Sequence, residues 1–461
     1  MSTSRLESLP TEILHQICVA ICSHCTEHRD YSRPWGPEEH QRFAEHRTET
    51  ETLGNLCLVS RRMNEVATPP LYHFFLEPTM HASETSWQRL LAVLDTFAKR
   101  PDLALHVKHA VMGGLISLNA SNMPLIHQVA RGIGVALPED WQDPGPEAYP
   151  GPISYFYAYH EDLVDEGPVD EDLGAEARCG IHHSFLVDLF FRSTRRLERL
   201  DLCVEHQLQI GKTLPPWITL DALKELWLRL CSMGVGGLCG FDSVAGILSR
   251  ALNLQILKVS GNRLPITLPE LKLKNLRHLE FNRCRLDWND LRNMLRCCGE
   301  LDTFIFSYGF HQMRETPPAT AFVAELAASQ PALKRLEITE RGHCEYSQNP
   351  YGDITPTSFK ALTELTHLRL DGFPLDSLPE RDDPVVRSTL LDLLPPSLQV
   401  ITLEKVSQNG LQVVQELVQQ GSLAIFPNLT KLLVYGWSRY KLDLGRIEWT
   451  PGSTTAEIIA P

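Results

Sequence analysis

The chain has 461 residues, 43% of them hydrophobic, so it is long enough to bury a large core and to form more than one domain. Its formal net charge is −14 and its pI is about 5.7, which argues against nucleic acid as a partner and favours basic or neutral protein surfaces. No apolar run is typical of a signal peptide or of a membrane span. We therefore expect a cytoplasmic or nuclear protein, away from membranes, whose cysteines are reduced.

An apolar helix is predicted directly after Pro10, whose missing N–H suits the first helical turn. A second apolar stretch runs over 53–66 and is stopped by Pro69-Pro70. Two short helices of this kind carry more apolar surface than they can cover for each other. The surplus indicates that helices of another protein cover it. The apolar stripe of the first helix contains Ile13, Leu14, Ile17, Cys18 and Ile21.

Two motifs in this region match one family in order. Leu9-Pro10-x-Glu12-Ile13-Leu14-x-x-Ile17, then Leu56-Cys57-Leu58-Val59-Ser60-Arg61-Arg62 with Pro70 and Leu71-Tyr72, resemble an F-box of the form common in fungal F-box proteins. The resemblance covers 1–76 and implies docking onto the Skp-type adaptor of a cullin–RING ubiquitin ligase. One departure is the polar insertion 22–52, which lacks an apolar period and is expected to loop out. The implied adaptor-binding residues are Leu9, Pro10, Ile13, Leu14, Ile17, Leu58 and Val59.

Next in the chain, a short strand is predicted at 73–76 and a helix over Ser86 to Lys99, ended by Pro101. One pattern then recurs: apolar, two variable residues, apolar, one variable residue, apolar. From position 197 onward its first residues are 22 to 33 positions apart, close to the period of leucine-rich repeats. The ten copies begin at Val107, Leu197, Leu223, Leu254, Leu276, Leu301, Leu333, Leu365, Leu398 and Leu429.

Helical stretches between these copies complete each unit as one strand plus one helix. They are expected at 182–192, 243–252, 288–298, 321–329, 389–394 and 411–418. One such unit cannot cover its own apolar face, so neighbours must stack. The array resembles the leucine-rich-repeat superfamily. The expected fold class is therefore α/β, an N-terminal helical F-box followed by an irregular solenoid with a parallel sheet on its concave face.

The domain organisation follows from these stretches. An F-box-like module at 1–76 leads into a linking helix and first repeat at 77–136. The stretch 137–180 is rich in proline, glycine and acidic residues, and is expected to be a partly disordered surface insertion. The repeat array then fills 181–436, and 437–461 is expected to cap it.

Residues that alternate with the apolar strand positions are expected to line the concave face. Trp227 is the most informative, because an exposed tryptophan beside Arg229 is costly unless a ligand covers it. We therefore expect a target protein to bind at Trp227, Arg229, Arg369 and Tyr435.

Several other motifs do not support catalysis or cofactor binding. Gly211-Lys212-Thr213 lacks the earlier glycine of a phosphate loop, and 234–240 reads as a flexible link. The spacing of Cys18, Cys22, Cys25 and His28 suits zinc, but Cys18 lies on the apolar helix face, so no metal site is expected. No nucleophile–base motif is present, and we expect neither an enzyme nor a cofactor.

Three functions remain open at this stage. The leading hypothesis is the substrate-recognition subunit of an SCF-type ubiquitin ligase, which acts by raising effective concentration. The first alternative is a repeat scaffold without a ligase, whose N-terminal helices only cap the solenoid. Whether Ile13, Leu14 and Val59 face solvent or the repeats separates these two. The other is an activator of small GTPases that presents Arg229 or Arg369 to a nucleotide, and a GTP-hydrolysis assay tests it.

Overall fold

The structure is a computed structural model, and its residues form two compact units, Met1–Asn253 and Leu254–Pro461, which are described separately. The first unit holds an N-terminal group of helices and the first strands, and the second holds the remaining strands. The described residues are 6, 8–26, 37–76, 86–113, 123–137, 184–205, 210–211, 214–231, 241–261, 271–284, 286, 288–308, 319–340, 358–371, 393–406, 414, 426–437, 443–449 and 457–459.

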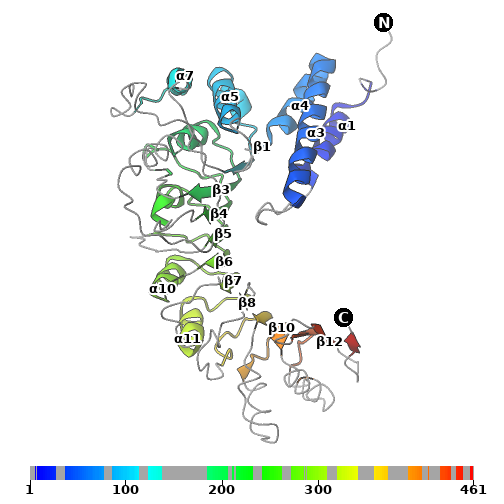
Figure 1. The fold of residues 1–461 in the computed structure, drawn as a ribbon, viewed down its shortest axis with the longest axis vertical. Helices are drawn as coiled ribbons and strands as arrows, with labels where there is room; N and C mark the ends of the chain where they lie inside the picture. Colours follow the sequence, from blue (N-terminus) through cyan, green and yellow to red (C-terminus); the bar gives the residue numbers. More distant parts are fainter. Residues whose placement is uncertain are drawn as a thin grey trace, which may run out of the picture. The chain divides into compact units, whose positions relative to one another are not determined.

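The N-terminal helices form a small module with its own core. They are α1 (Thr11–Ile21), α2 (Ser23–Thr26), α3 (Pro37–Val59) and α4 (Arg61–Tyr72), and α1, α3 and α4 lie side by side (Figure 1). The helix predicted after Pro10 is confirmed. The core of this helical module, 1–76, contains Leu14, Cys18, Cys22, Leu53, Met63, Val66 and Ala67.

The expectation that 22–52 loops out is wrong, because α2 and most of α3 occupy its described part. The first half of α3 has no apolar stripe, so its sequence gives no helical period. It is supported instead by pairs one turn apart, such as Gln41 Nε2 to Glu45 Oε1 at 2.9 Å and Arg47 Nε to Glu51 Oε1 at 2.8 Å. Among the described side chains of α3, those that pack into the module core belong to its last turns, from Leu53 onward.

The first unit continues with parallel strands in sequence order. These are β1 (Phe74–Leu76), β2 (His109–Met112), β3 (Arg199–Glu205) and β4 (Glu225–Cys231). The helical segments of this region are α5 (Ser86–Lys99), α6 (Pro101–Ala104), α7 (Met123–Ile133), 184–193, η3 (Phe241–Ser243) and α9 (Ala245–Leu248).

The second unit repeats the same arrangement. Its parallel strands are β5 (Ile256–Gly261), β6 (His278–Cys284), β7 (Thr303–Tyr308), β8 (Arg335–Glu340), β9 (His367–Asp371), β10 (Val400–Val406) and β11 (Lys431–Trp437). The helices α10 (Trp288–Cys297) and α11 (Ala319–Ser329) follow β6 and β7. Two antiparallel strands, β12 (Asp443–Trp449) and β13 (Glu457–Ile459), end the sheet.

All ten strands predicted from the recurring pattern are therefore confirmed, as is the short strand after His73. The helix over Ser86–Lys99 has the predicted bounds, and those near 182–192, 288–298 and 321–329 agree within two residues. The helix expected over 243–252 is shorter, only Ala245–Leu248 after a 3₁₀ turn. The 389–394 and 411–418 helices and the 137–180 insertion lie almost entirely outside the described residues.

Strand after strand begins with the same hydrogen-bond pattern. Two successive N–H groups donate to one carbonyl of the preceding repeat, as Lys334 and Arg335 do to Asp302 O at 3.0 and 2.9 Å. The first instance is at His73, whose carbonyl oxygen accepts from Lys108 and His109 at 3.0 Å each. The stacking is therefore set by the backbone, and it starts at β1. This α/β architecture is compatible with a leucine-rich-repeat solenoid.

The apolar strand positions face the helices. Phe304 of β7, fully buried, lies 6.2 Å from Phe322 of α11 between ring centroids, and Phe322 in turn contacts Trp288 of α10 at 6.1 Å. The alternating positions of these strands therefore point to the opposite face of the sheet. Among the described helices, none combines the length and the apolar character needed to cross a lipid bilayer.

Candidate functional site

The helical module leaves an apolar edge exposed to solvent. Leu58 is 84% exposed, Val59 51% and Ile13 40%, although each belongs to a helix whose other face is buried. Pro10 is also exposed at the start of α1. Burial of Leu58 alone is worth about 2 kcal/mol, so leaving it in water is costly unless a partner covers it.

One arginine brings the parts of this edge together. Arg62, in the first turn of α4, donates through Nη2 to the carbonyl oxygen of Leu9 at 2.7 Å and to Thr11 Oγ1 at 3.0 Å. The first turn of α1 is therefore held against the α3–α4 junction, which carries Leu58 and Val59. We call the exposed set Pro10, Ile13, Leu58 and Val59 the apolar edge.

The other residues implied by the F-box resemblance are less accessible. Leu9 and Ile17 are half-buried against the module. Leu14 is completely buried in the module core beside Met63 and Ala67, so it supports α1 from within. The sequence identifies the stripe but does not tell which of two successive residues, Ile13 or Leu14, turns inward.

The first unit places Trp227 and Arg229 in a covered position. Trp227 is only 5% exposed, and the guanidinium carbon of Arg199 lies 3.7 Å from the centre of its ring. Arg229 donates through Nε to Asp201 Oδ1 at 3.1 Å, and the Asp201 side chain is completely buried. The expectation of an exposed tryptophan is wrong, because the neighbouring strand β3 supplies both a cation for its ring and a carboxylate for Arg229.

In the second unit, Arg369 also has partners within the chain. Its Nη2 donates to Glu404 Oε1 at 2.6 Å and its Nη1 to Glu337 Oε2 at 3.4 Å, so it bridges strands on both sides of β9. Tyr435 is half-buried on β11, opposite Arg446 of β12. Arg369 is two strands from β11, so these two residues lie on one sheet but do not form a compact cluster.

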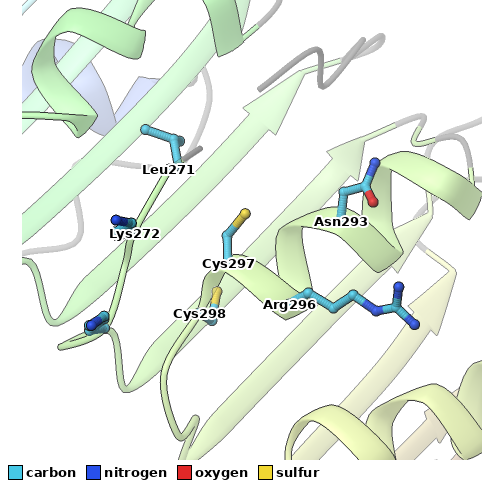
Figure 2. A pocket seen from close by; sticks show the side chains of 7 residues that line it. Leu271, Lys272, Asn293, Arg296, Cys297 and Cys298 are labelled. Carbon is cyan, nitrogen blue, oxygen red and sulfur yellow. The ribbon is translucent and has the colours of Figure 1, made fainter. Parts of the chain in front are cut away.

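A pocket of about 510 Å³ lies between the segment 271–274, which leads into β6, and the end of α10 (Figure 2). Lys272, Lys274 and Arg296 line it together with Cys297 and Cys298. Burial raises the pKa of both thiols, which keeps them protonated and weakly nucleophilic. Arg296 is further held by Glu325 at 2.7 Å. These features do not assemble a catalytic group.

Gly211, which belongs to the Gly-Lys-Thr sequence that partly matches a phosphate loop, has a structural role. Its φ is +82°, and a Cβ atom at this position would lie 2.7 Å from the backbone of Gly246. Its N–H donates to the buried Asp188 Oδ1 at 2.8 Å, so this donor is already used within the chain.

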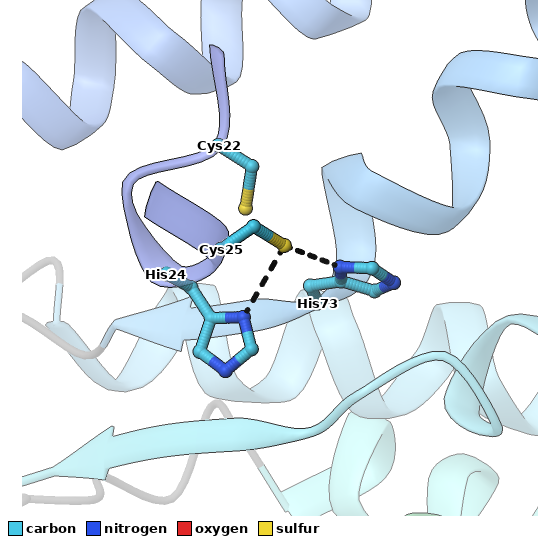
Figure 3. A group of neighbouring side chains, drawn as sticks. All are labelled: Cys22, His24, Cys25 and His73. Carbon is cyan, nitrogen blue, oxygen red and sulfur yellow. Dashed lines mark hydrogen bonds between the residues drawn. The ribbon is translucent and has the colours of Figure 1, made fainter. Parts of the chain in front are cut away.

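Four metal-ligating side chains meet where α1 ends and α4 leads into β1. Ligand atoms of Cys22, His24, Cys25 and His73 all lie within 4.8 Å of one another (Figure 3). Hydrogen bonds from Cys22, His24 and His73 lower the pKa of the Cys25 thiol well below its usual range. The same sharing of a proton with Cys25, together with burial, raises the pKa of Cys22.

This cluster differs from the set that the sequence spacing suggests, which is Cys18, Cys22, Cys25 and His28. Cys18 faces the module core, and His28 lies outside the described residues. His24 is the sequence neighbour of Cys25, so the sequence alone could have identified it as a candidate ligand. His73 was not recognisable, because 48 positions separate it from Cys25 and only packing of α4 brings it there.

Comparisons of the chain with models of known protein families and with curated proteins found no match.

Proposed function

We propose that this chain is a substrate-recognition subunit of an SCF-type ubiquitin ligase, without a bond-making activity of its own. The helical module docks on a Skp-type adaptor and the repeat sheet holds a target protein near the ubiquitin-loaded enzyme. The observation that carries the proposal is the apolar edge, a set of exposed apolar side chains on an otherwise self-sufficient helical module.

The burial pattern supports docking rather than capping. A helix group that only closed the end of the repeats would turn its surplus apolar side chains toward them. Instead Ile13, Leu58 and Val59 remain exposed, while Leu14 and Met63 fill the module's own core. Helices of an adaptor laid across this edge would remove its apolar area from water.

The target is proposed to bind the face of the sheet opposite the helices. Its described charges are largely compensated within the chain, for example by Lys258 and Glu280 at 3.4 Å and by Arg369 between two glutamates. A paired surface of this kind selects a partner by shape and by local exchange of ion pairs. The buried Trp227 and Arg229 are then framework, and Arg369 and Tyr435 remain the candidate contacts.

Adaptor binding tests the proposal directly. The double variant Ile13→Asp/Leu58→Asp places two negative charges on the apolar edge. It should fold, because neither of the two replaced side chains is buried. We expect co-purification with a Skp-type adaptor to fall at least about tenfold, since a buried unpaired charge costs several kcal/mol at an interface. Leu14→Asp is unsuitable, because it would unfold the module.

Leu252→Asp is the matched control. Leu252 is 56% exposed and lies outside the helical module, so replacing this exposed leucine by a charged aspartate should leave adaptor binding intact. If wild type and the double variant recover the adaptor equally, or neither recovers it, docking through this edge is refuted and a repeat scaffold without a ligase is the better account.

A further inference from the structure

The corner between α1 and α2 carries a Cys-x-x-Cys sequence, and it faces the corner between α4 and β1. Cys22 ends α1 and Cys25 lies in the single turn of α2, while His73 follows α4 directly. Cys25 Sγ lies 3.2 Å from His73 Nδ1 and 3.7 Å from His24 Nδ1. Figure 3 shows the Cys22 side chain directed to the same centre.

We propose that Cys22, His24, Cys25 and His73 form a structural zinc site. Two sulfurs and two imidazole nitrogens are the donor set that zinc prefers in closed tetrahedral sites. With Zn–S of about 2.3 Å and Zn–N of about 2.0–2.1 Å, tetrahedral ligand atoms lie about 3.3–3.8 Å apart. The distances from Cys25 Sγ to His73 Nδ1 and to His24 Nδ1, 3.2 and 3.7 Å, are already close to this range. All four ligand atoms lie within 4.8 Å of one another.

The burial of the four residues suits a structural metal. Cys22 is 4% exposed and His73 7%, so half of the ligand set is fixed in the protein interior. Cys25 is exposed and His24 half-exposed, which leaves a path for the ion. On binding, the thiol protons are released to solvent and both sulfurs coordinate as thiolates.

The position of the site indicates what a bound zinc ion would stabilise. Among the ligands, His73 is the residue whose carbonyl oxygen accepts from Lys108 and His109 at the start of β2. Zinc would therefore tie the end of α1 to the first hydrogen-bonded step of the repeat stack. In the described structure this tie otherwise relies on contacts such as the ring pair of His24 and His109, 5.6 Å apart.

A catalytic thiolate is the other chemistry this corner suggests, since Cys25 and His73 resemble a nucleophile and its base. That reading uses two of the four convergent residues and leaves Cys22 and His24 without a role. Alkylation separates the two. Zinc-bound thiolates react slowly with iodoacetamide until a chelator removes the ion, whereas a free thiolate reacts rapidly with or without chelator.

The test begins with the full-length wild-type protein, purified without chelator, and measures bound metal by plasma mass spectrometry. We expect about one zinc per chain. X-ray absorption should show two sulfurs at about 2.3 Å and two nitrogens at about 2.0–2.1 Å. The variants Cys25→Ser and His24→Ala change accessible ligands, so the fold should survive, and each should weaken zinc retention against a competing chelator at least about tenfold.

Two controls lie in the same module away from the cluster. Cys57→Ser, on α3, and His15→Ala, exposed on α1, should retain zinc as the wild type does. Chelation should also speed hydrogen exchange at 22–26 and 73–76 in the wild type and have no such effect in Cys25→Ser. The proposal is overturned if the wild type binds no zinc after incubation with it, if the metal shell lacks two sulfurs, or if Cys25→Ser keeps the ion. None of these outcomes depends on adaptor binding.

Discussion

At the scale of single residues, the polar face of the first unit contains an ion pair that is almost fully buried. The side chain of Arg229 is 10% exposed and that of Asp201 is completely buried, and Arg199 covers the neighbouring ring of Trp227. A buried pair of this kind contributes little net stability, but removal of one partner leaves the other as an uncompensated charge. Arg229 is therefore a structural residue unless binding rearranges it.

Replacement of Arg229 by methionine tests this role. We expect Arg229→Met to lower the free energy of unfolding by about 3 kcal/mol, because the Asp201 carboxylate then stays buried without its guanidinium. Urea denaturation followed by circular dichroism measures the loss. The double variant Arg229→Met/Asp201→Asn should regain part of it.

Lys224→Met is the corresponding surface control. Lys224 pairs with Glu198 at 3.3 Å, but both side chains are about half exposed, 53% and 45%, so its loss should cost less than about 1 kcal/mol. A variant Arg229→Met with wild-type stability and impaired target capture would instead restore Arg229 to the recognition surface.

At the scale of helices and strands, local periodicity predicted the repeats well. Apolar residues at alternate positions along a strand, such as Leu336 and Ile338, form a local pattern that predicts the strand, and every predicted strand was found. The first half of α3 had no such signal, because its helix is held by exposed pairs such as Arg47 and Glu51. The burial of Trp227 and the position of His73 beside Cys25 both depend on segments that are distant in the sequence. Local sequence patterns therefore do not predict them.

The turn between α11 and β8 depends on one buried amide. Gln330, completely buried, accepts a hydrogen bond from the N–H of Leu301 at 2.8 Å and donates to the carbonyl of Leu295 at 2.8 Å. It thereby joins the end of α11 to α10 and to the segment that enters β7. Hydrogen bonds of this kind fix how one helix follows another in a stack.

We expect Gln330→Leu to lower the free energy of unfolding by about 2 kcal/mol or more. Leucine fills a similar volume, but it leaves two buried backbone groups without a hydrogen bond, each worth about 1–3 kcal/mol. Gln255→Leu is the matched control, because the Gln255 side chain is exposed and its backbone carbonyl, which accepts from Arg277 and His278, is kept in the variant. Equal denaturation midpoints for the two variants would show that the amide bonds of Gln330 are dispensable.

At the scale of the whole molecule, the proposed docking and recognition roles fall on different compact units. The apolar edge belongs to Met1–Asn253, while Arg369 and Tyr435 belong to Leu254–Pro461. Each repeat chiefly contacts its neighbours in such arrays, so damage is expected to spread over adjacent repeats and not through the chain. The helical module, with its separate core, should be insulated from a defect in the second unit.

Phe304→Ala tests this separation. Phe304 is completely buried on β7 among Phe281, Phe306 and Phe322, with ring centroids 6.2 to 6.5 Å away, so its truncation should cost about 3–5 kcal/mol locally. Hydrogen exchange monitored by mass spectrometry should quicken over β6, β7, β8 and α11 and stay unchanged over 11–72. Adaptor binding should persist while target capture weakens, because Arg369 is held in part by Glu337 of β8.

The reciprocal change is Met63→Ala, which removes a side chain only 1% exposed from the module core. It should quicken exchange in α1 and α4, weaken adaptor binding and leave β6 to β8 protected. If either substitution quickens exchange throughout the chain, the two units unfold as one cooperative structure. Docking and target capture would then be lost together, because any core defect would lower the population of the single folded state that both functions require.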